Sequence, residues 1–435
     1  MKGRRVLGWV AVLALVLGAC TTKADDPTTT STTVPVTTTP ITAPPVLTGV
    51  GITEGTITLA ALLPLSGTLE TFGHSVLEGH EVYWAYVNET LGGVGGVYPV
   101  RIAPLDTVYD EQTARSLWAG REDDILAISS VLGSPITEAL VTEIGGERVL
   151  IAAGSQASSW AVSPNVVLNL AIPTYRDQIA GAVVAGGAEE PVVAANPPLG
   201  LIYQEGVFGE DCFVGFEQAT ARYPAGEAVS SRYPATATEF SDEVTTMQES
   251  AVQTLFVCSS PQAMLQIVAT LDLLEFRPTL VVTSASYDAS LPAALGGDGG
   301  EAAGLERLDN VFVVGSLPPF EGDAPGMKLL RDNLANYDTR LPDPRIINPW
   351  FFLGYTQAAT FHLILEEALT GGDLTREGVW AARDRLGETD FGFGSGSVVY
   401  DADRIPVVTD VFSVPAVSTE YLFGMQPVGG FYSTR

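Results

Sequence analysis

The sequence predicts an α/β protein built from parallel sheets that are covered by helices. Short apolar, partly β-branched segments alternate with segments of helical period along most of the chain after residue 49. Such alternation favours parallel sheets, because parallel strands are joined by helical crossovers. The span is also too long for one ordinary hydrophobic core, so we expect two lobes.

Residues 57–91 form the clearest strand, loop and helix unit. The apolar run 57–63 is followed by the turn residues 64–67, and apolar side chains then recur at spacings of three to five up to residue 91. Loops at the carboxyl ends of parallel strands line ligand crevices, and the next helix begins with unpaired N–H groups. Residues 66–72 are therefore a candidate ligand edge, with an ordinary strand-to-helix connection as the alternative.

The same alternation continues along the chain in two sets. The first set has expected strands at 100–105, 125–131 and 149–153, with helices at 110–124 and from 137 to about 145. The second has strands at 200–203, 228–232, 254–257, 279–283 and 311–314, with helices at 174–185, 209–221, 239–249 and 261–274. Helices at 326–337, 350–369 and 375–386 have no strand between them and are expected to cover an existing sheet. Late strands at 398–400, 407–412 and 421–423 are expected to be antiparallel.

The first 48 residues read as an export signal and a stalk. A basic start, an apolar run at 6–17 and the sequence Leu-Gly-Ala-Cys ending at Cys20 resemble a bacterial lipoprotein box, in which the cysteine carries lipid. A plain secretory signal with an incidental cysteine is the alternative. Residues 21–48 are rich in threonine and proline and have too few bulky apolar groups to fold, which predicts an extended linker.

Charge and cysteine content restrict the function classes. The formal net charge of −29 opposes binding to nucleic acid phosphates and to an anionic membrane surface. Cys212 and Cys258 are an even pair in an exported chain, which is compatible with a disulfide without establishing one. The three histidines, His74, His80 and His362, are not spaced as metal ligands with these cysteines or with one another. We therefore expect no metal and no cofactor.

Several short motifs occur in a fixed order over roughly residues 51–412. They are Leu-Pro-Leu-Ser-Gly at 63–67 with Phe-Gly at 72–73, Val-Leu-Gly-Ser-Pro at 131–135, Val-Leu-Ile-Ala-Ala-Gly-Ser at 149–155, Val-Phe-Gly-Glu at 207–210, Thr-Glu-Phe-Ser at 238–241, and Gly-Tyr at 354–355 with Leu-Glu-Glu-Ala-Leu at 365–369. This set, with the lipoprotein box, resembles the extracytoplasmic solute-binding proteins of bacterial ABC transporters, of the branched-chain amino acid (Leu/Ile/Val) binding type.

The resemblance implies a type I periplasmic binding fold, with two Rossmann-like lobes joined by a three-segment hinge. The crossings would fall near Pro173, Ser316 and Gly396. Lobe 1 would contain residues 49–172 and 317–395, and lobe 2 residues 173–316 and 396–435. Ligand would bind in the cleft between the lobes and select the closed state by touching both.

The resemblance also carries ligand-binding positions onto the first lobe. Ser134 matches the serine that meets the ligand's carboxylate, and Pro135 opens the helix behind it. This fits the affinity of helix N-termini for small anions. Ser155 and Ala157 match a backbone carbonyl and a threonine hydroxyl, with Gln156 or Ser158 as a substitute for the missing hydroxyl. The serines have helix capping as their alternative role.

Two aromatic residues and one loop complete the implied site. Phe72 and Phe208 match aromatic ligand contacts, and packing in the core is their alternative role. The family's acidic partner for an amino group would follow the strand at 279–283, where this chain has Ser284, with Tyr287 and Asp288 a few residues later. Tyr287 and Asp288 have an ordinary turn as their alternative role. Because an unpaired buried ammonium costs several kcal/mol, a simple α-amino acid is less favoured than another carboxylate, an amide or an aromatic acid.

The resulting hypothesis is a lipid-anchored receptor on the extracytoplasmic face of a bacterial membrane. It would capture a small polar solute, either an amino acid or a related carboxylate or amide, and deliver it to ABC permease subunits. A ligand-sensing lipoprotein without a transport role is the alternative. The chain has no Gly-x-Ser-x-Gly, His-Glu-x-x-His or Walker motif, so we do not expect an enzyme.

Overall fold

The computed structural model describes residues 45–67, 69–184, 198–222, 228–287, 290–315, 322–337, 349–393, 397–400, 405, 410–415 and 428–433. Residues 45–435 form one compact unit. The expected export signal, including Cys20, and most of the expected linker lie outside the described residues. None of the helices in the described part has both the length and the apolar character needed to cross a bilayer.

The first sheet has six strands and carries helices on both faces. Its strands are β2 (Ile52–Thr53), β3 (Thr56–Leu63), β4 (Val100–Asp106), β5 (Ala127–Val131), β6 (Ile151–Ala153) and β7 (Val166–Val167). The order is β2-β3-β5-β6-β7, β4 also pairs with β3, and every pair is parallel except the β2–β3 hairpin.

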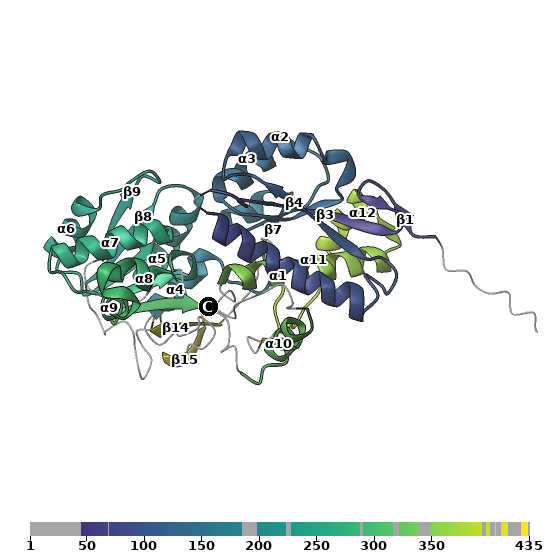
Figure 1. Ribbon diagram of the computed structural model, residues 1–435. Coiled ribbons are helices and arrows are strands. Elements are labelled where there is room, and N and C mark those ends of the chain that lie inside the picture. Colours follow the sequence, from purple (N-terminus) through teal and green to yellow (C-terminus); the bar gives the residue numbers. More distant parts are fainter. Residues whose placement is uncertain are drawn as a thin grey trace, which may run out of the picture. The chain divides into compact units, whose positions relative to one another are not determined.

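Alternate residues of β3 show why both faces of this sheet are covered. Ile57 and Leu59 pack in one core cluster with α1 (Glu70–Thr90), α10 (Pro325–Tyr337), α11 (Pro349–Thr370) and α12 (Arg376–Arg383). Ala60 and Leu62 pack in another with α2 (Glu111–Ala119) and α3 (Ser134–Ile144). The period of two in a strand sends successive side chains to opposite faces. Figure 1 shows α2 and α3 on one side of the strands and α1 with α11 on the other.

The second sheet has seven strands in the order β15-β14-β12-β11-β10-β8-β9. Parallel pairs join β8 (Leu199–Gln204), β9 (Ala228–Tyr233), β10 (Thr254–Cys258), β11 (Thr279–Thr283) and β12 (Val311–Gly315). The strands β14 (Asp410–Pro415) and β15 (Val428–Ser433) are antiparallel additions. Its helices are α4 (Tyr175–Val184), α5 (Val207–Arg222), α6 (Ser241–Glu249), α7 (Pro261–Leu273), α8 (Leu291–Gly296) and α9 (Gly300–Glu306). The predicted α/β class with two parallel sheets is confirmed.

Short elements differ from the expected ones at several places. Leu47 and Thr48, assigned above to the linker, form β1 and pair in parallel with β13 (Asp373–Leu374). The helix expected at 110–124 ends at Ala119 and is followed by the 3-10 turn η1 (Glu122–Asp124), while η2 (Ser158–Val162), η4 (Ser284–Ser286) and η5 (Gly297–Gly299) are further 3-10 turns. The strand expected at 421–423 lies outside the described residues, and Val398 forms only an isolated bridge with Thr389.

Two glycines allow α1 and α11 to cross in backbone contact. A Cβ on Gly79 would lie 2.1 Å from the Phe351 carbonyl oxygen, and a Cβ on Gly354 would lie 2.0 Å from the Val76 carbonyl oxygen. No side chain fits at either position, so the close crossing depends on glycine. It sets the relative position of the two helix starts, which lie at the cavity described below.

Candidate functional site

A cavity of about 510 Å³ lies where loops from both sheets meet. The first turns of α1, α3, α4, α5, α7 and α11 contribute to its wall, together with the end of β8 and the loops that follow β4, β5, β6, β9 and β10. Its apolar and aromatic lining residues are Leu69, Phe72, Tyr109, Leu132, Pro135, Tyr175, Val207, Phe208, Ala235, Pro261, Ala285 and Trp350. Its polar and glycine lining residues are Gly133, Ser134, Glu138, Gly154, Ser155, Gln204, Glu205, Gly206, Ser259, Ser260 and Gln262. Such placement at the carboxyl ends of strands is where ligands bind in open parallel sheets.

The positive charge in this cavity comes from backbone N–H groups rather than from basic side chains. None of the described residues that line it is Lys, Arg or His. The unpaired N–H groups at helix N-termini carry partial positive charge, and several such ends meet here. The two lining glutamates, Glu138 and Glu205, are exposed, and Glu205 lies 3.8 Å from Arg232. The inner part of the cavity is therefore suited to a small anion.

Two buried hydroxyls in the cavity have no hydrogen-bond partner. Ser155 follows β6 in the first sheet and is 6 % exposed, whereas Ser259 follows β10 in the second sheet and is fully buried. Neither Oγ atom has a hydrogen-bond partner of normal geometry. The Tyr175 hydroxyl lies near Ser155 and the Tyr233 hydroxyl lies near Ser259, and each serine is close enough to influence the pKa of its neighbouring tyrosine. Burying an unsatisfied hydroxyl costs on the order of 1–3 kcal/mol. A polar ligand would satisfy one such group from each sheet.

Aromatic side chains form the apolar part of the wall. The rings of Phe72 and Trp350 have centroids 5.1 Å apart, and those of Tyr175 and Phe208 are in edge contact at 4.6 Å. Burial raises the pKa of the Tyr175 hydroxyl to about 12, so this phenol stays protonated at neutral pH and is available as a donor.

The structure brings five of the predicted site residues together and leaves four aside. Phe72, Ser134, Pro135, Ser155 and Phe208 line the cavity, whereas Gln156, Ala157, Ser284 and Tyr287 are not among the lining residues.

Local hydrogen bonding explains where these other residues lie. Gln156 and Ala157 are buried behind the wall, where the Gln156 carbonyl accepts from the Tyr175 N–H at 3.1 Å. The Ser286 hydroxyl donates to the Val257 carbonyl at 3.2 Å and holds the turn after β11 against the sheet. Tyr287 therefore packs in the core, and Ala285 lines the cavity instead of Ser284. Asp288 lies outside the described residues.

Sequence reasoning missed several lining residues. Tyr109 and Gln204 follow or end strands, and the carboxyl-end rule applied to every strand would have found them. Ser259 and Gln262 flank the start of α7, where the Ser260 hydroxyl accepts from the Ala263 N–H at 3.2 Å as an N-cap. Trp350 belongs to a helix far along the chain, and no local pattern predicts its contact with Phe72.

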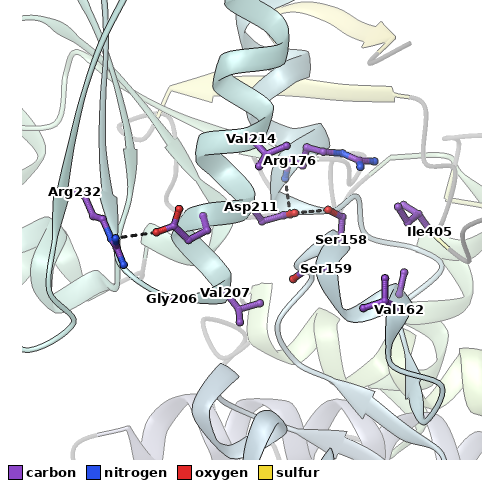
Figure 2. A pocket seen from close by; sticks show the side chains of 12 residues that line it. Ser158, Ser159, Val162, Arg176, Gly206, Val207, Asp211, Val214, Arg232 and Ile405 are labelled. Carbon is purple, nitrogen blue, oxygen red and sulfur yellow. Dashed lines mark hydrogen bonds and ion pairs between the residues drawn. The ribbon is translucent and has the colours of Figure 1, made fainter.

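A second cavity of about 800 Å³ lies between η2 and one face of α5 (Figure 2). Figure 2 shows the Asp211 carboxylate accepting from the Ser158 hydroxyl and, at 2.8 Å, from the backbone N–H of Arg176. Burial raises the pKa of Asp211, and these hydrogen bonds oppose the shift. Arg232 lies 3.1 Å from Glu210. Because its carboxylates already have hydrogen-bond or ion-pair partners, this cavity is less suited to binding a polar ligand than the smaller one.

A disulfide holds part of the smaller cavity in place. Cys212 in α5 is bonded to Cys258 at the end of β10, with a Cα–Cα separation of 6.5 Å, and both residues are fully buried. Phe208 lies one turn before Cys212, and Ser259 directly follows Cys258. The bond therefore fixes two parts of the wall relative to each other.

Comparisons with known proteins agree with this geometry. The family described as periplasmic binding protein matches residues 56–416. A fatty acid ABC transporter substrate-binding protein from Thermomonospora curvata is similar in structure, with a TM-score of 0.75 and 21 % identity, covering 89 % of this chain and 95 % of that one. No curated protein matches in sequence.

Two further solved structures have the same architecture. A possible leucine/isoleucine/valine-binding protein from Rhodopirellula baltica SH 1 gives a TM-score of 0.66 at 17 % identity, covering 87 % of this chain and 96 % of that one. A solute-binding protein of an ABC transporter from Rhodopseudomonas palustris HaA2, in complex with p-hydroxybenzoic acid, gives 0.67 at 16 % identity, covering 87 % and 98 %. At these identities the likeness shows the fold, which is the type I periplasmic binding fold. The predicted resemblance is confirmed, and the chain belongs to the periplasmic binding protein family.

Proposed function

We propose that this protein binds a small carboxylate with an apolar body and delivers it, chemically unchanged, to an ABC importer. The observation that carries the proposal is the cavity in which several helix N-termini meet two unsatisfied hydroxyls, Ser155 and Ser259. A carboxylate would accept hydrogen bonds from both hydroxyls and from the N–H groups at the start of α3. The aromatic wall would cover the rest of the ligand.

The cavity favours a ligand without an ammonium group. The position expected to hold an acidic partner has Ser284, which does not line the cavity and lies 3.4 Å from Gln178 Oε1. The lining carboxylates, Glu138 and Glu205, are both exposed. An ion pair with a solvent-exposed carboxylate offsets little of the desolvation free energy of a buried ammonium. The simple acid should therefore bind better than the corresponding amino acid.

Leucine and 4-methylpentanoate test this directly, because they differ only by the ammonium group. In calorimetric titrations of the purified protein at pH 7, we expect a micromolar Kd for 4-methylpentanoate, about −8 kcal/mol, and binding of leucine at least about 10-fold weaker. Tighter binding of leucine would show that a glutamate receives the ammonium. The absence of binding by either compound, and by benzoate and octanoate, would contradict the proposed function.

Ser134 and Ser241 provide a matched pair of variants. Each serine is the first residue of its helix, but only Ser134 lines the cavity. Ser134→Ala should weaken 4-methylpentanoate binding on the order of 10-fold, because it removes one donor to a charged group. Ser241→Ala should leave the Kd unchanged. Equal effects of the two substitutions would remove Ser134 from the site.

We further propose that Cys20 is lipidated and that residues 21–48 tether the folded part to the membrane. Cys20→Ser should release the protein from the membrane fraction and reduce cellular uptake of the bound acid, while the Kd of the purified protein stays the same. Localisation by fractionation and uptake of radiolabelled 4-methylpentanoate measure the two effects. Unchanged uptake in cells that lack the protein altogether would favour the sensory alternative over import.

A further inference from the structure

Asp211 is a buried carboxylate beside the proposed ligand site. It lies near the start of α5, is 5 % exposed, and is not among the residues that line the smaller cavity. Its carboxylate accepts hydrogen bonds from the Ser158 hydroxyl and, at 2.8 Å, from the Arg176 N–H (Figure 2). Because burying a carboxylate costs free energy, the contacts that Asp211 makes must account for its presence here.

The two donors belong to chain segments that also form the wall of the smaller cavity. Ser158 lies in the segment after β6, which contributes Ser155 to the wall. Arg176 directly follows the wall residue Tyr175 at the start of α4. The carboxylate itself lies one turn after the wall residue Phe208 in α5. One carboxylate therefore connects three segments, and each of them contributes a side chain to the wall.

Other contacts join these segments in pairs. The Tyr175 N–H donates to the Gln156 carbonyl at 3.1 Å, which joins α4 to the segment after β6. A Cβ on Gly215 would lie 2.3 Å from the Arg176 carbonyl oxygen, so α4 and α5 pack in backbone contact. The Arg176 N–H is one of the amino-terminal groups of α4 that have no partner within the helix, and Asp211 supplies an acceptor for it. Of these contacts, the carboxylate is the one that joins all three segments.

We propose that Asp211 is a positioning residue of the ligand site, and that its carboxylate fixes the three wall segments relative to one another without touching the ligand. The inference rests on the proposed function, since it names a residue on which the geometry of the carboxylate site depends. The segment of Ser158 follows a strand of the first sheet, whereas α4 and α5 pack on the second, so these contacts also connect the two sheets at the cavity. A ligand that meets a wall already in place does not have to offset the entropy of ordering it.

Two substitutions of Asp211 separate positioning from charge. Asp211→Ala and Asp211→Asn both remove a negative charge, which by itself would favour an anionic ligand. Asparagine still accepts from the Arg176 N–H and donates to the Ser158 hydroxyl oxygen, whereas alanine makes neither contact. In calorimetric titrations of the full-length protein with 4-methylpentanoate, the Kd of Asp211→Asn should stay within about 3-fold of the wild type. The Kd of Asp211→Ala should be about 10-fold higher than that of Asp211→Asn, because the wall is no longer held in place.

Asp177 provides a matched control for the alanine variant. It is 7 % exposed, accepts from the Thr174 hydroxyl at 2.8 Å and lies 3.4 Å from the Arg176 guanidinium. These contacts lie within the start of α4 and do not connect it to another wall segment. Asp177→Ala should therefore lower the urea midpoint and leave the Kd of the folded protein unchanged. An equal rise of the Kd in Asp177→Ala and Asp211→Ala would overturn the inference, because damage to α4 alone would explain it.

Ser158 tests the same connection from its other end, also where Asp211→Ala does not fold. Ser158→Ala should raise the Kd at least about 3-fold, because the hydroxyl donor is lost. Ser158→Thr should restore the wild-type Kd, since threonine keeps the hydroxyl and the second cavity beside this residue has space for a methyl group. In the Asp211→Ala protein, Ser158→Ala should have no further effect, because both substitutions remove the same contact. Effects that multiply would contradict the proposed connection.

The outcomes separate this inference from the proposed function. If the wild type binds 4-methylpentanoate and the Kd is the same in Asp211→Asn, Asp211→Ala and Ser158→Ala, Asp211 is not a positioning residue and the proposed function stands. If the wild type binds neither 4-methylpentanoate nor benzoate nor octanoate, both proposals are overturned.

Discussion

Replacing both Cys212 and Cys258 with alanine should lower the free energy of unfolding by about 4 kcal/mol. The two cysteines are 46 residues apart in sequence, and the entropy of closing a loop of that length in the unfolded chain is worth about this much. Urea unfolding followed by far-UV circular dichroism measures the change. Ligand affinity should fall as well, because the disulfide joins the start of α5 to the end of β10, next to Phe208 and Ser259.

Reduction of the wild type provides the control for this experiment. Wild-type protein unfolded with dithiothreitol present should have the urea midpoint of the double variant, and the variant's own midpoint should not respond to dithiothreitol. A thiol assay under denaturing conditions first establishes that the pair is oxidised in the wild type. Equal midpoints for oxidised wild type and double variant would contradict the expected stabilisation.

The second large effect concerns His80 and acid stability. This residue of α1 is fully buried, and neither ring nitrogen has a hydrogen-bond partner. Burial lowers the pKa of His80 from 6.5 to about 4, and the nearby Gln357 opposes the shift only in part. The Gln357 amide already makes two other hydrogen bonds, accepting from the Ser130 hydroxyl at 2.7 Å and donating to the Ala153 carbonyl at 3.0 Å. The imidazole is therefore neutral in the folded protein at pH 7.

The lowered pKa makes the folded state lose stability in acid. Above pH 6.5 the imidazole is neutral in both states and has no effect. Between pH 6.5 and about 4 the unfolded chain takes up a proton that the folded protein does not, which removes about 3 kcal/mol of stability in total. Urea midpoints measured from pH 7.5 to 4 should therefore fall more steeply in the wild type than in His80→Leu, which cannot titrate at this position.

The difference between the two pH profiles isolates His80 from other titrating groups. Asp211 and His362 also have shifted pKa values, but they are present in both proteins and their effects cancel. His80→Gln offers a polar control, because it removes the titration and keeps an amide in place of the ring. Parallel profiles for wild type and both variants would show that His80 does not limit acid stability.

Local patterns predicted the regular parts of the fold with little error. The apolar run predicted at 57–63 is β3, and the run at 279–283 is β11 with the same bounds. Both strands are buried on two faces, so their sequences are nearly continuous apolar runs that differ clearly from the amphipathic helices around them. The boundaries of edge elements were less predictable, as β1 and η1 show, because few buried residues specify them.

The candidate site was predictable where it follows directly from a strand. Ser134 and Phe208 each lie at or beside a helix start just after a parallel strand, and both line the cavity. Tyr287 does not line the cavity, because a short 3-10 turn after β11 directs its side chain into the core. The hydrogen bond from Ser286 that holds this turn cannot be predicted from a local sequence pattern. One residue of difference in a turn decides which side chain lines the cavity.

The order of strands and helices, the acidic charge and the pair of cysteines are properties of the sequence by itself. They determined the α/β class and indicated that the loops after the strands are candidate ligand-binding positions, because periodicity and composition act over a few residues. Only the tertiary structure decided that Trp350 meets Phe72, that Asp211 contacts Ser158, and that the hydroxyls of Ser155 and Ser259 lack partners. Those facts depend on how segments distant in sequence pack together, and close packing leaves no local trace in the chain.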